Sequence, residues 1–499
     1  MFHRLPKTGR RVQQDTRSWL LPGCPAAHHR RRGMGRTGRA TIPAAARFRL
    51  RRYHPPVPTL KPFRGLRYAP SQGPDLSAVV CPPYDIIPPA LAEELLARSP
   101  ANAVHLELPR PEPGGDDDTR YRAAARTLAE WRTEGIIIKE RQPALYIHEM
   151  RWAAGGLRTE GRARGVLTRL RLEAFGPASG IRPHERTMSG PKEDRFRLLK
   201  ATGVNLSPVV LLADGGPGIH DSLDGFTARE PDLVATTDDG VANRVWVVPV
   251  ERDEDGQATG EAGRLLASLG AHPLTIADGH HRYETALRYR AERDTRRACE
   301  SDPAWDYVFA LVYDLSEAPP VLPTHRVLMG GPSGDALIES LGDLVDIEAV
   351  AGPDALLARM SMPEALPDAD ATGTGRMGLV SGERTMLLRV RPAAFDALGD
   401  LSASAASRGL DVNRLAIMLE RSGVDREALA AGGRVSYVKD PAEAVGMATG
   451  GAAAATFLLD GPPVSAVTRV AAAGEVMPQK STFFDPKAPT GLVFGPLEW

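Results

Sequence analysis

The residue types best suited to chemistry stand together near the middle of the chain, in the segment ADGHHRYETAL. Asp278, Gly279, His280, His281 and Arg282 follow a short apolar run and precede a helical pattern, which predicts a strand, a tight turn and a helix. The unpaired backbone N–H groups at such a helix start carry about half a positive charge and suit a phosphate or a carboxylate. Arg282 adds donors that match phosphate oxygens, and the Asp and His side chains supply acid–base or metal-binding capacity. The same residues also fit a structural role, with Asp278 as a helix cap and the histidines as hydrogen-bonding groups.

A second segment, IRPHERTMSGPKEDRFRLLKAT, carries both charges around a Ser-Gly-Pro turn before an amphipathic helix. Its polar side chains are those of His184, Glu185, Arg186, Thr187, Lys192, Asp194 and Arg195. Such a turn can bind an anion and can also hold a cation. A solvated loop before a charged helix start accounts for the same pattern, so the segment alone does not decide between the two interpretations.

A third segment, EVMPQKSTFFDPKAPTGLVF, lies close to the C-terminus. Lys480, Ser481 and Thr482 have the order found at the end of a phosphate-binding P-loop, but the preceding glycines are missing and GxxxxGK[ST] occurs nowhere in the chain. A P-loop is therefore excluded. The alternative is a terminal strand and loop that pack on the core.

Lysine usage connects the second and third segments. The chain has 8 Lys and 54 Arg, and Lys192, Lys200, Lys480 and Lys487 all lie in or beside these two segments. Under such a bias we expect lysine to persist where a compact ammonium must reach a phosphate or a reacting group and arginine does not serve.

Length and charge bound the organisation of the chain. A chain of 499 residues predicts two or three domains. It contains no run of 18 apolar residues, so we expect no membrane-spanning helix. Three distant cysteines exclude a disulfide framework and favour a cytoplasmic location. Residues 1–60 hold 13 Arg, one Lys and one acid, a net charge of +13, so the other residues carry −13. We interpret 1–60 as a disordered basic extension, with a transit peptide or a nucleic-acid arm as alternatives; an acidic folded part makes nucleic acid a possible but not a favoured partner.

The rest of the chain predicts a mixed α/β or α+β protein. Strand patterns occur at IIIKERQPALYIHEMRW, LRTEGRARGVLTRLRL, SPVVLLAD and NRVWVVPV, and helical patterns occur at PGGDDDTRYRAAARTLAEWRTEG (residues 113–135) and EAGRLLASLG. The stretch DLSAVVCPPYDII predicts a short strand and a Pro-rich turn. After the Gly330–Pro332 break, helices at SGDALIESLGDL and VNRLAIMLERSG alternate with strands at GLVS, TMLLRV, VSYV and ATFLL. We predict domains at 61–330 and 331–499, and the lack of a fixed period excludes a solenoid.

Seven stretches of the chain together resemble one known family. In order from about residue 63 to 495 they are FRGLRY, CPPYDII, NAVHLELP, HERTMSGPKEDR, ADGHHRYETAL, LPTHR and MPQKSTFFDPKAPTGLVF. The chain is identified by them as a member of the bacterial and archaeal family called domain of unknown function 1015. In its DGHHR-type segment that family is similar to the ParB and sulfiredoxin superfamily, which includes nucleotide-binding DNA-segregation proteins and kinases that phosphorylate free serine with ADP or ATP. The resemblance implies a ParB/sulfiredoxin-like part over 61–330 and an additional C-terminal α+β unit.

The resemblance also implies a site. It places residues 278–282 at the nucleotide phosphates and a carboxylate, Glu185 or as second choice Asp85, as base toward the substrate hydroxyl. The predicted catalytic residues are Glu185, Asp278 and His281. The predicted nucleotide- and phosphate-binding residues are Lys192, Arg195, Gly279, His280, Arg282, Lys480 and Ser481. Asp278 is the predicted ligand of Mg²⁺.

Three functions are considered for this site. The first is a kinase that uses ADP or ATP with Mg²⁺ to phosphorylate a small hydroxyl compound such as free serine, since phosphoryl transfer needs mainly positioning and charge neutralisation. The second is a ParB-like nucleotide-binding module with a DNA or protein partner and little catalysis, which predicts a basic face outside residues 1–60. The third, a metal-dependent hydrolase using Asp278, His280 and His281, is disfavoured because no HxH or HExxH spacing occurs.

Overall fold

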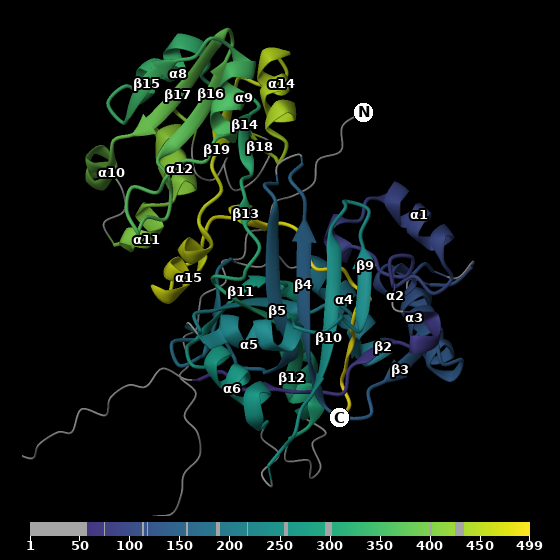
Figure 1. Ribbon diagram of the computed structural model, residues 1–499. Helices are drawn as coiled ribbons and strands as arrows, with labels where there is room; N and C mark the ends of the chain where they lie inside the picture. Colours follow the sequence, from purple (N-terminus) through teal and green to yellow (C-terminus); the bar gives the residue numbers. More distant parts are fainter. Residues whose placement is uncertain are drawn as a thin grey trace, which may run out of the picture. The chain divides into compact units, whose positions relative to one another are not determined.

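A large mixed sheet forms the centre of the first part of the protein. The computed structural model describes residues 57–73, 75–111, 114–116, 118–155, 158–185, 190–216, 218–253, 258–294, 302–398, 402–424 and 434–499. Within these ranges nine strands join in the order β6-β11-β8-β12-β5-β4-β10-β9, with β1 added beside β5 (Figure 1). They are β1 (Leu60–Lys61), β4 (Ala144–Trp152), β5 (Gly161–Arg171), β6 (Ile181–Pro183), β8 (Val209–Ala213), β9 (Leu233–Thr236), β10 (Ala242–Pro249), β11 (Leu274–Asp278) and β12 (Tyr307–Asp314). The predictions for residues 1–56, Arg186 and Thr187 lie outside the described residues.

The sheet is mixed because two of its pairings are parallel. β11 runs parallel to β6, and β12 runs parallel to β8. Along the middle of the sheet, the pairings of β12 with β5, of β5 with β4 and of β4 with β10 are antiparallel. Every residue of β12 is buried, and so is most of β4 and β5. Strands buried on both faces read as nearly continuous apolar runs, which explains the pattern ALYIHEMRW and YVFALVYD.

Helices cover both faces of this sheet. Apolar side chains of α5, α6 and α7 pack with Leu145, Ile147 and Val166 in one core, and side chains of α1 to α4 pack with Tyr146, Met150 and Leu167 in the other. Neighbouring residues of β4, such as Leu145 and Tyr146, belong to different cores because successive side chains of a strand point to opposite faces of the sheet. The helices are α1 (Pro89–Arg98), α2 (Val104–Glu107), α3 (Thr119–Thr133), α4 (Gly190–Thr202), α5 (Gly218–Thr227), α6 (Gly260–Leu269) and α7 (His280–Asp294).

A second sheet is formed by strands between His325 and Leu459, on both sides of the Gly330–Pro332 break. Its six strands among the described residues are all antiparallel, in the order β15-β17-β16-β19-β14-β18. Side chains of α8 and α12 pack with residues of these strands in one apolar core. Side chains of α9 and α14 pack in a second core, which also contains residues of these strands. The strands are β14 (His325–Leu328), β15 (Val345–Ala349), β16 (Arg376–Ser381), β17 (Arg384–Val390), β18 (Val435–Val438) and β19 (Ala455–Leu459). The helices are α8 (Gly334–Leu341), α9 (Pro353–Ser361), α10 (Pro392–Leu398), α11 (Ala405–Arg408), α12 (Asp411–Arg421), α14 (Pro441–Thr449) and α15 (Val464–Ala472).

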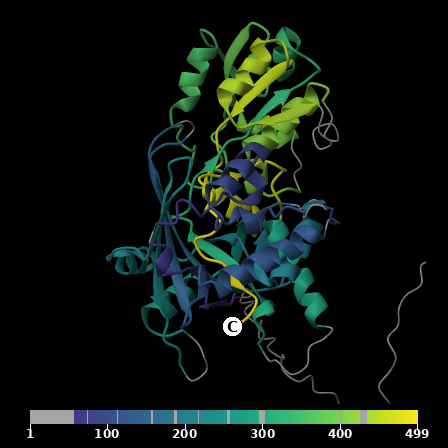
Figure 2. The same ribbon diagram turned by 90° about the vertical axis from the view of Figure 1, so that its right-hand side faces the viewer.

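The C-terminal segment joins elements that are far apart in the sequence. After α15, β20 (Phe483–Phe484) pairs with β13 (Val321–Leu322), and β21 (Gly495–Pro496) pairs with β7 (Val204–Asn205). Between them, Thr490 exchanges backbone hydrogen bonds with Cys81, and Phe494 with Leu66. Figure 2 shows this segment, in yellow, running beside the purple and blue N-terminal elements, which include the small sheet of β2 (Leu66–Tyr68) and β3 (Ile137–Lys139). Residues 490–494 therefore lie close to the start of the folded chain.

The predicted mixed α/β class is confirmed, as are the strands and helices predicted on both sides of the Gly330–Pro332 break. The predicted short strand before CPPYDII is wrong. Residues 77–79 form a turn instead, because the carboxylate of Asp75 accepts hydrogen bonds from the backbone N–H of Ser77 at 2.9 Å and from its hydroxyl at 2.5 Å. Such local side-chain bonds give the backbone an alternative to sheet pairing. Of the described helices, none combines the length and the apolar character needed to cross a bilayer.

Candidate functional site

The turn between β11 and α7 has the strand–turn–helix form that the sequence predicts. β11 ends at Asp278, Gly279 has φ +87°, and α7 begins at His280. One helical turn later, Arg282 folds back and donates to Oδ2 of Asp278 at 2.7 Å and to the carbonyl oxygen of Pro208. A Cβ atom at position 279 would lie 2.9 Å from Nε of Arg282. Glycine is therefore required both by the positive φ and by the space that the guanidinium occupies.

A lysine from the C-terminal segment lies between two carboxylates at this turn. Nζ of Lys487 is 2.5 Å from Oδ2 of Asp85 and 3.6 Å from Oδ1 of Asp278. Asp85 belongs to the single helical turn Tyr84–Ile86 that follows the Pro pair of CPPYDII. Three segments that are separated by roughly two hundred residues each therefore meet in one cluster, with Asp278 between Lys487 and Arg282.

The electrostatics of this cluster favour the charged forms. Burial alone would raise the pKa of Asp278, but the positive charges of Lys487 and Arg282 outweigh it and hold that pKa below its usual value. Burial alone would lower the pKa of Lys487, but the carboxylates of Asp278 and Asp85 outweigh it and raise that pKa. Two acidic and two basic side chains therefore balance one another in a site where Lys487 is only 12% exposed and Arg282 14%.

Two histidines from different predicted motifs contact each other beside the cluster. Nδ1 of His184 donates to the carbonyl oxygen of Ile276 at 2.5 Å, so its Nε2 accepts from the hydroxyl of Thr482 at 2.8 Å. The backbone N–H of His184 donates to Nε2 of His280 at 3.3 Å, and the two rings are 4.7 Å apart, edge to face. Burial lowers the pKa of both histidines, that of His280 to about 3. Both rings are neutral at physiological pH, and the proton of His280 lies on Nδ1.

Glu185 follows His184 and comes close to the third motif. Burial raises the pKa of Glu185, with a further increase from the charge of Asp278, while the charge of Lys480 and a hydrogen bond from its backbone N–H lower it in part. The backbone N–H of Met477 donates to the carbonyl oxygen of His184 at 2.7 Å, which fixes the two motifs against each other. Glu185 is thus a half-buried carboxyl group with increased proton affinity at the edge of the cluster.

The remaining predicted residues take different places. Lys480 is exposed and has φ +58°, whereas Ser481 is buried and its hydroxyl donates to the carbonyl oxygen of Pro478 at 2.5 Å. Lys192, at the start of α4, forms an ion pair with Glu284 of α7. His281 is partly exposed at the second position of α7.

Arg195 of α4 reaches the same region as Asp85. It donates to the carbonyl oxygen of Glu107 at 3.1 Å and to the carboxylate of Asp194. Its guanidinium carbon lies 4.3 Å from the ring centre of Tyr84. Burial raises the pKa of Tyr84, and the charges of Arg282 and Arg195 partly offset this effect. Tyr84 therefore contacts Arg195 and is close enough to Arg282 to be affected by its charge.

Small cavities adjoin the cluster on several sides. A cavity of about 30 Å³ is lined by Asp278, Arg282 and Lys487 together with Pro83 and Pro208. A larger one of about 220 Å³ shares Pro83 and Lys487 with it and extends along the apolar side chains of α1. A third, of about 50 Å³, is lined by Arg282 together with Arg195 and Glu107. Arg282 thus borders two of these cavities.

The donor set at Asp278 does not form an open metal site. Magnesium is usually bound by one or two carboxylates together with phosphate oxygens and water. Here Oδ1 of Asp278 faces the ammonium of Lys487, and Oδ2 accepts from Arg282. Within the described ranges, no three His, Cys, Asp or Glu side chains gather in a way that could hold a metal ion. The ammonium of Lys487 takes the position between two carboxylates that a cation would take, and we derive no step through Mg²⁺.

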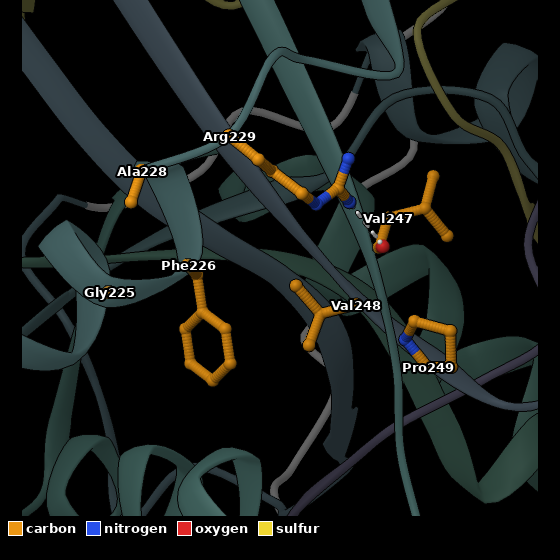
Figure 3. A pocket seen from close by; sticks show the side chains of 7 residues that line it. All are labelled: Gly225, Phe226, Ala228, Arg229, Val247, Val248 and Pro249. Atoms are coloured by element: carbon orange, nitrogen blue, oxygen red, sulfur yellow. Dashed lines mark hydrogen bonds between the residues drawn. The ribbon is translucent and has the colours of Figure 1, made fainter.

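A further hollow, of about 320 Å³, lies between α5 and β10 and differs in character (Figure 3). Its one charged side chain, Arg229, donates to the carbonyl oxygen of Val247 at 2.9 Å and to the carboxylate of Asp232 at 2.6 Å. The other lining residues are Gly225, Phe226, Ala228, Val248 and Pro249. This hollow offers no acid–base pair, so we place the candidate chemistry at the β11–α7 turn.

Part of the site does not follow from the sequence motifs. The motifs assign no role to Tyr84, Glu107 or Thr482, and they point to Lys487 only because lysine is scarce in this chain. The scarcity of lysine is a usable signal for Lys487, and the Pro pair before Tyr84 is a signal for a rigid turn. For Glu107 the sequence held no signal, because its importance depends on the distant partners Arg195 and Ser207.

Comparison of the sequence with family profiles identifies the family. The profile described as "Protein of unknown function (DUF1015)" matches residues 60–413, so the chain belongs to this family. No curated protein matches the chain.

The search of solved structures gives weak likenesses. A free serine kinase in complex with AMP is 14% identical with a TM-score of 0.29, covering 61% of this chain and 83% of that one. A conserved hypothetical protein from Pyrococcus furiosus is 13% identical with a TM-score of 0.28, covering 63% and 92%. SbnI with a C-terminal truncation, from Staphylococcus aureus, is 11% identical with a TM-score of 0.28, covering 64% and 84%.

Proposed function

We propose that the protein is a kinase that transfers a phosphoryl group from ADP or ATP to the hydroxyl of a small molecule such as free serine. The observation that carries this proposal is the convergence of three motifs on the β11–α7 turn, where Arg282 and Lys487 both contact Asp278. Phosphoryl transfer depends mainly on positioning and on neutralising the charge of the phosphates. Two fixed cations at a helix N-terminus supply both.

Binding of a phosphate would exchange partners within the cluster. Arg282 and Lys487 are paired with carboxylates, and a nucleotide phosphate offers each a more highly charged acceptor. The backbone N–H groups at the start of α7 are further donors at this turn, and His280, whose Nε2 accepts from the backbone N–H of His184, carries its proton on Nδ1. Because His280 stays neutral, it can donate a hydrogen bond without adding charge.

Glu185 is our candidate for the base. A carboxylate with a raised pKa is a better proton acceptor near neutral pH than an ordinary one. In the proposed step the hydroxyl oxygen of the acceptor forms a bond to the terminal phosphorus, and the bond from that phosphorus to the bridging oxygen breaks. The bonding electron pair leaves with the nucleotide, and the proton of the hydroxyl passes to Glu185.

The experiment separates binding from transfer. Nucleotide binding is measured as a rise in melting temperature, and transfer as phosphorylated product after incubation with ATP or ADP, Mg²⁺ and serine, ethanolamine or glycerol. We expect wild type to bind and to transfer, and Glu185→Gln to bind with a similar shift while losing at least about two orders of magnitude in turnover. The matched control is Glu130→Gln on the exposed side of α3.

Two results contradict the proposal in different ways. If no nucleotide shifts the melting temperature of wild type, the phosphate site is wrong. If nucleotides bind but no hydroxyl compound is phosphorylated, the kinase is wrong and the ParB-like nucleotide-binding module takes its place.

A further inference from the structure

A small, partly open cavity adjoins Arg282. It has a volume of about 50 Å³ and is lined by polar and apolar side chains from the end of α2, from α4, from α7 and from β7 with the residues after it. Arg282 lines this cavity and also the cavity of Asp278 and Lys487, so the two cavities adjoin the same side chain. Anything bound here is therefore next to the proposed phosphate site.

Three residues that line this cavity each carry a buried polar atom with no hydrogen-bond partner among the residues that the structure describes. The atoms are Oε2 of Glu107, Nδ2 of Asn205 and Oγ1 of Thr285, and their residues are 2%, 9% and 5% exposed. A buried polar atom without a partner costs about 1–3 kcal/mol, so three of them around one cavity indicate that something polar fills it. The other oxygen of Glu107 is already used, since it accepts from the hydroxyl of Ser207 at 2.9 Å and faces Arg195 at 3.6 Å.

The chemistry of these atoms defines what fits. Oε2 of Glu107 accepts only, Nδ2 of Asn205 donates only, and the hydroxyl of Thr285 does either. Arg195 and Arg282 also line the cavity, but their guanidinium groups already donate to carboxylates and to backbone carbonyls. The atoms without a partner therefore favour a group that both donates and accepts. One water-sized group needs about 10–15 Å³ of such volume, so the cavity takes about four non-hydrogen atoms. A vicinal diol, two carbons with two hydroxyls, has this size and this donor and acceptor pattern.

We propose that this cavity binds the 2′- and 3′-hydroxyls of the nucleotide's ribose, with Glu107 as their principal acceptor. A carboxylate that accepts hydrogen bonds from ribose hydroxyls is a recurrent solution in nucleotide sites. The position agrees with it, because a ribose next to Arg282 leaves its phosphates on the side of Asp278 and Lys487. The inference rests on the proposed function, since it deepens the same site by naming the part of the nucleotide that it recognises.

The test compares nucleotides that differ only in these hydroxyls. Titration calorimetry on the full chain measures the Kd of ATP, 2′-deoxy-ATP and 2′,3′-dideoxy-ATP. We expect the dideoxy compound to bind at least about tenfold more weakly than ATP, because Glu107 then loses the donors to its buried oxygen. Glu107→Gln is expected to bring the ratio of the two Kd values toward one, and Thr285→Val to lower it by a smaller factor. Glu130→Gln, on the exposed side of α3, is the matched control and leaves the ratio unchanged.

The outcomes distinguish this inference from the proposed function. Equal Kd values for ATP and the dideoxy compound in wild type overturn the ribose pocket and mean that the cavity holds water, while nucleotide binding itself stands. Failure of every nucleotide to bind overturns the proposed function and the pocket together. The wild-type comparison needs no substitution, so it is decisive even if Glu107→Gln fails to fold.

Discussion

Each of the two sheets carries a partly buried Arg–Asp pair, and the two pairs differ in what surrounds them. In the second sheet, Arg376 is 5% exposed and contacts both oxygens of Asp460, at 2.7 and 2.9 Å, while its other donors reach backbone carbonyls of residues 359–362. At the β11–α7 turn, Arg282 reaches one oxygen of Asp278 and one carbonyl, and its carboxylate is shared with Lys487.

The difference separates a structural pair from a candidate functional one. An arginine whose donors are all used inside the fold has nothing left for a ligand, whereas Arg282 borders two cavities and holds a carboxylate that has a second cation nearby. The residue types are the same, so residue identity alone does not distinguish the two roles. The two roles are distinguished by how many N–H groups of the arginine already have an acceptor and by whether a cavity adjoins its side chain.

The largest expected effect is on stability in the second sheet. Arg376→Ala leaves Asp460 buried, at 15% exposure, without its cation and should lower the free energy of unfolding by about 3–5 kcal/mol. Urea denaturation of wild type and variant measures the difference. A loss below about 1 kcal/mol would remove the structural half of the comparison.

Arg282→Ala should act mainly on nucleotide binding. Because Asp278 is 30% exposed and retains Lys487, we expect the free energy of unfolding to fall by only about 1–3 kcal/mol. The affinity for ATP or ADP should fall at least about tenfold, as expected for the loss of a charge-assisted contact. Arg421→Ala, at an exposed ion pair between the end of α12 and Asp343 in the turn after α8, is the control and should change neither quantity appreciably.

A smaller effect concerns pH and His280. Its pKa in the fold, about 3, is below its ordinary value of 6.5, so the unfolded chain binds more protons between these values. The contribution of His280 to stability is therefore present above pH 6.5 and is lost as pH falls toward 3. In wild type, the free energy of unfolding should fall between pH 7 and pH 4.5, and His280→Gln should make this fall smaller. His272→Gln, at an exposed position, is the control and should leave the size of the fall unchanged. Identical pH profiles for wild type and His280→Gln would show that this ring is not held neutral.

The smallest effect comes from two glycines with positive φ. Gly279 (φ +87°) has the guanidinium of Arg282 within 3 Å of its virtual Cβ, and Gly382 (φ +58°), between β16 and β17, has open space. Alanine at either position costs about 1 kcal/mol in backbone strain, and only Gly279→Ala should also displace Arg282 and weaken nucleotide binding. Equal nucleotide affinity of the two variants would contradict the role given to Arg282.

The sequence predicted local elements better than their assembly. The strand ending at Asp278, the helix after it and the hairpin of β4 and β5 follow from apolar periodicity and turn residues, and they are as predicted. The contact of Lys487 with Asp85 joins residues 402 positions apart, and no local pattern encodes such a distance. The pairing of Arg282 with Asp278 is likewise a tertiary outcome, because the same residues could equally have pointed to solvent.

A structure of the protein crystallised with ADP tests the central claim most directly. The account predicts that the phosphates lie at the start of α7, within hydrogen-bond distance of Arg282 and Lys487, and that Asp278 loses at least one of these two partners. Phosphates bound elsewhere, with the contacts of Asp278 to Arg282 and Lys487 unchanged, would contradict it.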